Sequence, residues 1–273
     1  MGTFSASTAL WLALLGFGVG TFGTLVGAGG GFILTPILLV VYPHDSPRTI
    51  TAISIAVVFF NAVSGSVAYA RQRRTDYRSG IVFAAATLPG SILGALAVGH
   101  VSRTVFDGLM AAVLAAAALW LLTGGSGDGR PASGGAPRTI VDRRGVRYAY
   151  HVRLARGAAL SVGVGFVSSF LGIGGGIIHV PLLVRALGFP VHVATATSHF
   201  VLAVMSGTAS LTHLVQGSYR VGHGMRRTLA LSAGVIAGAQ LGARISVRLS
   251  GVLIQRLLAL ALLALCARLA ASL

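Results

Sequence analysis

The chain has 273 residues, of which 55% are hydrophobic and only 10% are charged. An ordinary soluble domain has roughly a quarter charged residues, so this composition excludes a soluble globular protein. All 21 basic residues are arginine and all 5 acidic residues are aspartate, which gives a formal net charge of +16. Such a charge often indicates nucleic-acid binding. Here the arginines lie in short clusters between long uncharged runs, so no nucleic-acid partner is expected.

The uncharged runs are long enough to cross a membrane, because a spanning helix needs about 20 mainly apolar residues. They occupy residues 1–44, 49–70, 79–102, 108–127, 157–184, 186–219 and 228–243, and a mostly apolar segment follows at 251–271. Continuous Leu, Ala and Val residues are typical of helices and not of the alternating strands of a β-barrel. The sequence therefore predicts an all-α polytopic membrane protein.

A polar segment at residues 123–156 divides the chain. It begins with several glycines and holds seven arginines, which is typical of a flexible linker. We therefore expect three parts: a membrane repeat over residues 1–122, a basic cytoplasmic linker over residues 123–156, and a second membrane repeat over residues 157–273.

Five short motifs recur in the same order in the two halves, at offsets of 142 to 145 residues. The matched pairs are 29–31 with 174–176, 51–54 with 195–198, 64–65 with 206–207, 77–80 with 219–222, and 90–95 with 234–239. Self-similarity of this kind indicates an internal duplication. Each half is expected to hold about four hydrophobic segments. The first of them, 8–42 or 157–187, is interrupted by a Gly-rich stretch.

The positive-inside rule suggests an orientation for these segments. The loops at 71–78 and 220–227 and the linker are the most basic parts of the chain, and such parts usually face the cytoplasm. Eight single crossings with parallel halves and both termini in the cytoplasm satisfy the rule. Inverted halves are the second topology. They require each broken segment to re-enter or to cross twice, and they place one of the two loops outside.

The Gly-rich breaks at 27–31 and 172–176 are the most informative feature of the sequence. Each glycine costs a helix about 1 kcal/mol relative to alanine, and unwound backbone at membrane depth must be buried in protein or line a water-filled cavity. A helix that restarts after the break directs free N–H groups and a positive dipole end at that place. Close helix packing would explain one such run better, but recurrence in both halves favours a transport site between them.

Polar residues within the apolar segments extend this candidate site. Serine and threonine often bond only their own helix backbone, whereas intramembrane Asn, Gln and His are functional candidates by default. Thr195 belongs to one polar cluster, and His179 follows the second break. We expect substrate binding at Gly29, Gly30, Gly31, Thr51, Ser54, Asn61, Gly174, Gly175, Gly176, Thr197, Ser198 and Gln240, and proton coupling at His199 or His179.

The residue inventory disfavours several kinds of chemistry. The chain has no Glu, a single cysteine at Cys266, and no His pair at helical spacing supported by a carboxylate. We therefore expect no metal and no other cofactor. The same shortage of acids argues against an enzyme and against a cation pathway. A cavity with basic and neutral donors suits an anionic substrate.

These motifs together resemble the sulfite exporter TauE/SafE family. The resemblance rests on Gly-x-Gly-Gly-Gly with Pro five residues later in each half, and on residues 194–198, 206–207, 217–220 and 238–244. It covers the chain except the linker. It implies a two-repeat carrier of the cell inner membrane that exports small sulfur-containing anions such as sulfite or organosulfonates. His199 departs from the small residue expected after the Thr-Ser step, which leaves a different substrate or proton coupling open.

The sequence thus predicts a secondary transporter that exports a small oxyanion or sulfonate by alternating movement of its two halves. An anion channel, or a carrier for another small organic anion, is the alternative. The expected partners are the anionic substrate and the lipid bilayer, and a homodimer is compatible with the sequence.

Overall fold

The computed structural model describes residues 5–123, 135–219 and 223–270. Within these ranges the helices are α1 (Ala6–Val26), α2 (Gly31–Val41), α3 (Pro47–Arg71), α4 (Tyr77–Ala97), α5 (Arg103–Thr123), α6 (Leu154–Leu171), α7 (Gly176–Pro181), α8 (Val191–Val215), α9 (Gly224–Ser246) and α10 (Gly251–Ala270). A 3-10 turn (Val98–His100) extends α4, and a π-helical stretch (Leu182–Ala186) extends α7. The strands β1 (Ala136–Val141) and β2 (Arg147–Val152) form one antiparallel pair.

Most of the long helices are membrane-spanning candidates. Within the described residues seven helices have the length and hydropathy to cross a bilayer, namely α1, α3, α4 with its 3-10 turn, α5, α6, α8 and α9. Large apolar side chains such as Leu10, Ile81 and Leu211 are exposed on the outer surface of the bundle, where the acyl chains of a membrane would cover them. The prediction of an all-α polytopic membrane protein is confirmed.

Local sequence signals set several helix ends. The Ser46 side chain caps α3 by accepting a hydrogen bond from the N–H of Thr49, and Pro47 follows at a position where its missing N–H costs nothing. Asp76 caps α4 in the same way. Gly27 and Gly172 end α1 and α6 with φ of +80° and +68°, the left-handed conformation that glycine adopts without steric cost.

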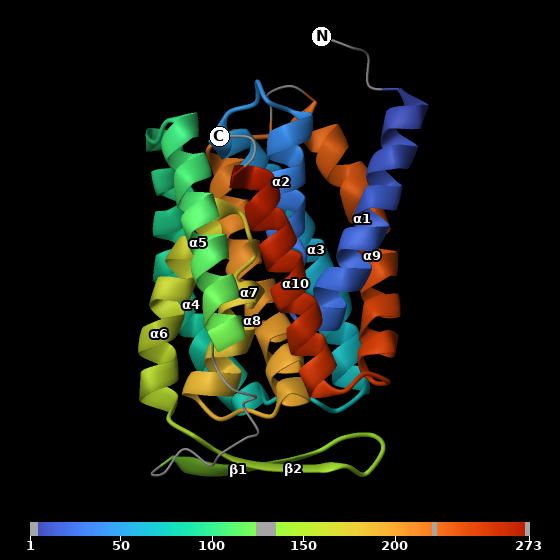
Figure 1. Ribbon diagram of the computed structural model, residues 1–273, viewed down its shortest axis with the longest axis vertical. Coiled ribbons are helices and arrows are strands. Elements are labelled where there is room, and N and C mark those ends of the chain that lie inside the picture. The colour runs from blue at the N-terminus through green and yellow to red at the C-terminus, as the bar shows by residue number, and fades with distance from the viewer. Residues whose placement is uncertain (1–4, 124–134, 220–222, 271–273) are drawn as a thin grey trace.

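Each Gly-interrupted segment folds into a helical hairpin, and the two hairpins open at opposite ends of the bundle. Figure 1 shows α1 running down from the upper end and α2 returning to it, whereas α6 rises from the lower end and α7 returns downward. The following three helices cross the whole bundle in each half. This order of elements is the one expected of inverted halves.

The prediction of eight single crossings with three basic segments on one side is therefore wrong. Arg227, expected in the 220–227 loop, lies in the first turn of α9 and pairs with Asp45 before α3, at an Nη1–Oδ2 distance of 2.6 Å. At the other end of α3, the Gln72 carbonyl accepts a hydrogen bond from the Arg143 N–H of the linker. Residues 71–78 and the described residues 223–227 thus lie at opposite ends, because a re-entrant hairpin leaves each half with an odd number of crossings. The described start of α1 and end of α10 lie opposite the linker (Figure 1).

The helix contacts of the two halves correspond. α1 packs along α9 as α6 packs along α4, while α3 contacts α8 and α5 contacts α10. Gly234 and Gly238 fit against the α1 backbone, and Gly90 and Gly94 fit against the α6 backbone, so closely that an added Cβ would overlap main-chain atoms. The recurring Gly-x-x-x-Gly pair therefore serves close helix packing in both halves. The duplication itself stays a prediction with which these contacts agree.

Part of the segment predicted as a flexible linker is a docked β-hairpin. β1 and β2 pair from Ala136 opposite Val152 to Val141 opposite Arg147, and a turn with Gly145 at φ +82° joins them. The Tyr150 hydroxyl donates to Asp76 Oδ2 at 2.9 Å, which ties the strands to the start of α4. Alternating β-branched and aromatic residues in β1 and β2 carried a strand signal, which the glycines and arginines obscured.

Candidate functional site

The two Gly-rich breaks lie against each other in the middle of the bundle. An atom added at Cβ of Gly31 would lie 2.7 Å from the carbonyl oxygen of Gly172, and one on Gly176 would overlap the backbone of Ala28. Only glycine permits this approach, because any side chain would occupy the same space. Gly29, Gly30, Gly174 and Gly175 all have positive φ between +63° and +83°. The structure thus brings together the two predicted backbone sites.

The helix that follows each hairpin packs on the break of the other half. On α3, Thr51 contacts Gly172 and Val58 contacts Gly174; on α8, Thr195 contacts Gly27 and Leu202 contacts Gly29. Ser54 and Ser198 occupy matching positions three residues after these threonines, and residues at this spacing share a helix face. The polar residues predicted on α3 and α8 are therefore arranged around the breaks.

At the second break the hydroxyl groups bind the backbone. The oxygen atoms of Thr35 and Ser54 each lie 2.8 Å from the Gly172 carbonyl oxygen and 2.8 Å from each other. The Thr51 hydroxyl reaches the carbonyl oxygen of Phe170 at 3.5 Å. All three hydroxyl-bearing residues are buried. In this conformation they satisfy carbonyls that the end of α6 leaves without helical partners.

At the first break a polar network joins α1, α3 and α8. Asn61 donates from Nδ2 to the Gly29 carbonyl oxygen at 3.0 Å and accepts from the Thr24 hydroxyl at 3.1 Å. His199 Nε2 lies 3.2 Å from the Thr24 hydroxyl oxygen, and the Tyr69 hydroxyl donates to the Thr24 carbonyl at 2.6 Å. Since the Thr24 proton points to Asn61, His199 Nε2 is assigned as the donor.

Four buried polar side chains near the breaks have no hydrogen-bond partner among the described residues. They are Ser168, Ser169 and Ser198 at their hydroxyl groups and His179 at both ring nitrogens. All four are 0% exposed. An atom added at Cβ of Gly175 would lie 2.6 Å from the Ser168 hydroxyl, which places Ser168 against the second break. Buried polar groups are normally satisfied, so these groups can serve a bound anion or water.

Two predicted binding residues lie away from the breaks. The Thr197 hydroxyl accepts a hydrogen bond from the Asp76 N–H at 3.0 Å, near the start of α4. Gln240 donates from Nε2 to the Ser64 carbonyl and hydroxyl oxygens at 2.8 and 2.9 Å, which joins α9 to α3. These hydrogen bonds tie helices together and do not reach either break.

Sequence reasoning missed several residues that the structure places beside the breaks. Thr24 and Ser169 each stand three residues before the Gly that ends α1 or α6, so the repeat offset could have identified this pair. Thr35 lies within α2, the helix that restarts after the first break, and was not among the predicted residues. Tyr69 lies eight residues beyond Asn61 on α3, and only the folded chain brings its hydroxyl to the first break.

The described acidic residues lie toward the two ends of the bundle and not at the breaks. Asp45, Asp76, Asp107 and Asp142 all pair with arginine there. Among the described residues no group of three or more His, Cys, Asp or Glu could hold a metal ion. The polar groups at the breaks are therefore hydroxyl, amide, imidazole and backbone groups, without a carboxylate that would repel an anion.

Comparisons with known proteins agree with this architecture. The family model described as sulfite exporter TauE/SafE matches residues 12–269. The chain is 32% identical to the probable membrane transporter protein YunE of Bacillus subtilis, over 86% of this chain and 87% of that protein. It is 26% identical to a probable membrane transporter protein of Methanocaldococcus jannaschii, over 88% and 86% of the two chains. No solved structure matches this chain.

Proposed function

Since this chain belongs to the sulfite exporter TauE/SafE family and is a membrane transporter and not an enzyme, we propose that it exports a small sulfur-containing anion, sulfite or an organosulfonate, across the cell inner membrane. The two Gly-rich breaks would form the substrate site. Backbone N–H groups of the restarted helices and hydroxyl donors beside them would bind the oxygen atoms of the anion.

The buried donors without partners support this proposal most directly. Ser168 lies against the second break, and Ser198 lies one helical turn from Thr195, which contacts the first break. Neither hydroxyl has a hydrogen-bond partner among the described residues. Leaving such groups unsatisfied costs about 1–3 kcal/mol each, so a ligand that accepts hydrogen bonds would recover this free energy. The absence of a carboxylate among the described groups there favours an anion over a cation.

The contact between the breaks favours a carrier over an open channel. Gly31 and Gly176 lie against the opposite break, so passage of an anion would require the two helical hairpins to separate. Movement of the hairpins against α3 and α8 would expose the site to each side in turn. A channel for anions is the second candidate, and saturation of flux distinguishes the two.

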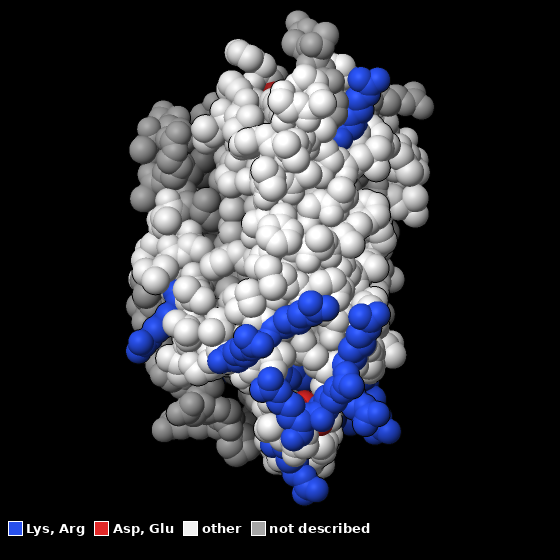
Figure 2. Space-filling view, turned by 90° about the vertical axis from the view of Figure 1, so that its right-hand side faces the viewer, with Lys and Arg blue, Asp and Glu red and all other residues white. Residues whose placement is uncertain are grey.

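We further propose that the end of the bundle on which the β-hairpin (β1 and β2) docks, here called the hairpin end, faces the cytoplasm. Most described arginines lie at this end, and Figure 2 shows them gathered on the lower part of the molecule. By the positive-inside rule, the start of α1 and the end of α10 would then face outward, opposite to the orientation expected from the sequence. A cysteine introduced at exposed His44 would react with an impermeant thiol reagent on intact cells, whereas one at Arg147 would be protected.

The function is tested by sulfite and organosulfonate flux in proteoliposomes. A carrier gives flux that saturates with substrate concentration and shows counterflow, whereas a channel gives flux that does not saturate. A binding anion must also raise the melting temperature of the purified protein, because it binds the folded state. Absence of both flux and stabilisation with all these anions would exclude the proposed substrate class.

We propose His199 as the first candidate for proton coupling, because its side chain is buried in the polar network. A His199→Gln variant keeps an amide donor for Thr24 but cannot titrate, so sulfite flux should lose its stimulation by a pH gradient and retain downhill exchange. The exposed His44 provides the control His44→Gln, which should respond to the gradient as the wild type does. Full stimulation of the His199→Gln variant would exclude this residue, and His179→Gln then tests the second candidate.

A further inference from the structure

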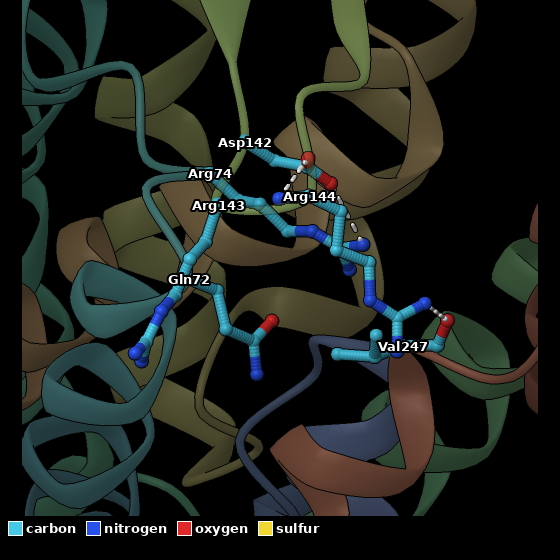
Figure 3. Close-up of a pocket in the computed structure, with 6 residues that line it drawn as sticks. All are labelled: Gln72, Arg74, Asp142, Arg143, Arg144 and Val247. Carbon is cyan, nitrogen blue, oxygen red and sulfur yellow. Dashed lines mark hydrogen bonds and ion pairs between the residues drawn. The ribbon is translucent and has the colours of Figure 1, made fainter.

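A second polar site lies at the hairpin end of the bundle, away from the breaks. A cavity of about 280 Å³ is lined by Gln72, Arg74, Asp142, Arg143, Arg144 and Val247, and we call it the hairpin pocket. It lies between the turn after α3, the turn of the β-hairpin and the end of α9. Figure 3 shows the Asp142 carboxylate beside Arg74, with Arg144 reaching toward Val247.

The acidic residue of the hairpin pocket is already committed to other partners. Asp142 Oδ1 accepts hydrogen bonds from the N–H groups of Arg144 and Val146 at 2.8 and 3.0 Å, and Oδ2 lies 3.2 Å from Arg74 Nη2. Burial alone would raise the pKa of Asp142, but the two N–H groups and the Arg74 guanidinium outweigh it and lower the pKa. The carboxylate is therefore ionised at neutral pH and balances one arginine.

The remaining positive charge has no counter-ion among the described residues. Arg143 and Arg144 form none of the ion pairs found there. Arg144 Nη1 donates only to the Val247 carbonyl oxygen, at 3.4 Å. With Arg74 balanced by Asp142, the exposed Arg143 and Arg144 leave two positive charges at the rim of the hairpin pocket without a counter-ion among the described residues.

The hairpin pocket also contains buried polar atoms that have no partner. Arg74 is 4% exposed, and its Nη1 has no hydrogen-bond partner among the described residues. The same holds for Gln72 Oε1, while Gln72 Nε2 donates to the Ala243 carbonyl. A buried guanidinium nitrogen without an acceptor is costly, and an anionic or hydroxyl-bearing group bound there would satisfy it.

We propose that the hairpin pocket binds a phosphate group, supplied as inorganic phosphate or as the headgroup phosphate of an anionic lipid such as phosphatidylglycerol. Arginine matches phosphate because its planar N–H groups can donate to two oxygens at once. The pocket lies at the end of the spanning helices, where basic clusters commonly bind lipid headgroups. Gln72 Oε1 would accept from a hydroxyl group of hydrogen phosphate or of the lipid glycerol.

The test compares wild-type protein with the double variant Arg143→Gln, Arg144→Gln and with Arg147→Gln. Arg147 lies on the same hairpin and is exposed, so its variant removes charge without altering the lining of the pocket. One arm titrates inorganic phosphate at constant ionic strength and records the melting temperature. The other arm uses phosphatidylcholine nanodiscs with and without phosphatidylglycerol, and measures stability and retained lipid by native mass spectrometry.

We expect wild type and Arg147→Gln to be stabilised, and the double variant to need at least about tenfold more phosphate or phosphatidylglycerol for the same shift. Ser198→Ala should retain the response, because Ser198 belongs to the breaks. A response to phosphate alone identifies a soluble anion, and a response to phosphatidylglycerol alone identifies a lipid. Equal responses of the wild type and the double variant, or no response to either probe, would overturn the proposal. If the double variant does not fold, the single variant Arg143→Gln is measured in its place and should also need more phosphate or phosphatidylglycerol than the wild type.

Discussion

Replacing Gly31 or Gly176 by alanine is expected to lower the melting temperature strongly and to abolish transport. A methyl group at Gly31 would lie 2.7 Å from Gly172 O and from Ile173 C, and one at Gly176 would overlap the backbone of Ala28. Overpacking a dense core costs about 1–3 kcal/mol, and backbone atoms have less freedom to move than side chains. Thermal unfolding and sulfite flux measure the two effects.

The chain offers matched controls for this prediction. Gly18 of α1 and Gly163 of α6 are exposed, and an added Cβ at either would meet no atom within 4 Å. Alanine favours a helix by about 1 kcal/mol over glycine, so Gly18→Ala and Gly163→Ala should preserve or raise stability. If Gly31→Ala behaves like these controls, the contact between the two breaks does not exist in the folded protein.

A Ser198→Ala variant is expected to bind the transported anion about 10- to 100-fold more weakly while keeping its stability. A hydrogen bond to a charged group contributes about 1.5–3 kcal/mol, and each 1.4 kcal/mol corresponds to about tenfold in affinity. The Ser198 hydroxyl has no hydrogen-bond partner among the described residues, so its removal should lower the stability of the protein little. Thermal stabilisation by sulfite across a concentration series gives the affinity.

Ser54 is the matching position in the first half and provides the comparison. Its hydroxyl donates to Gly172 O at 2.8 Å, so Ser54→Ala should destabilise the empty protein by about 1 kcal/mol and change affinity less. Wild-type sulfite affinity in the Ser198→Ala variant would remove Ser198 from the proposed site. A larger affinity loss in Ser54→Ala than in Ser198→Ala would show that this hydroxyl changes partner when the anion binds.

Composition and repetition were enough to determine the class of this protein. Long uncharged runs predict membrane helices because a bilayer cannot satisfy charged or unpaired polar groups. The Gly-rich stretches predict breaks because glycine disfavours a helix, and φ is positive at Gly29 and Gly174. Ser54 and Asn61 could be predicted as candidates because polar groups are costly inside a membrane, and the structure places both beside the breaks.

Tertiary structure alone decided the path of the chain and the partners of the polar groups. The basic segments at 71–78 and 220–227 look alike in sequence, yet the helical hairpins place residues 71–78 and the described residues 223–227 at opposite ends. Residues 136–152 form a docked hairpin because Asp142 and Tyr150 find partners on the turn after α3 and at the start of α4. Hydrophobic runs predict which segments are buried in the membrane. They do not predict the direction in which each segment crosses the bundle, because that depends on contacts between segments distant in sequence.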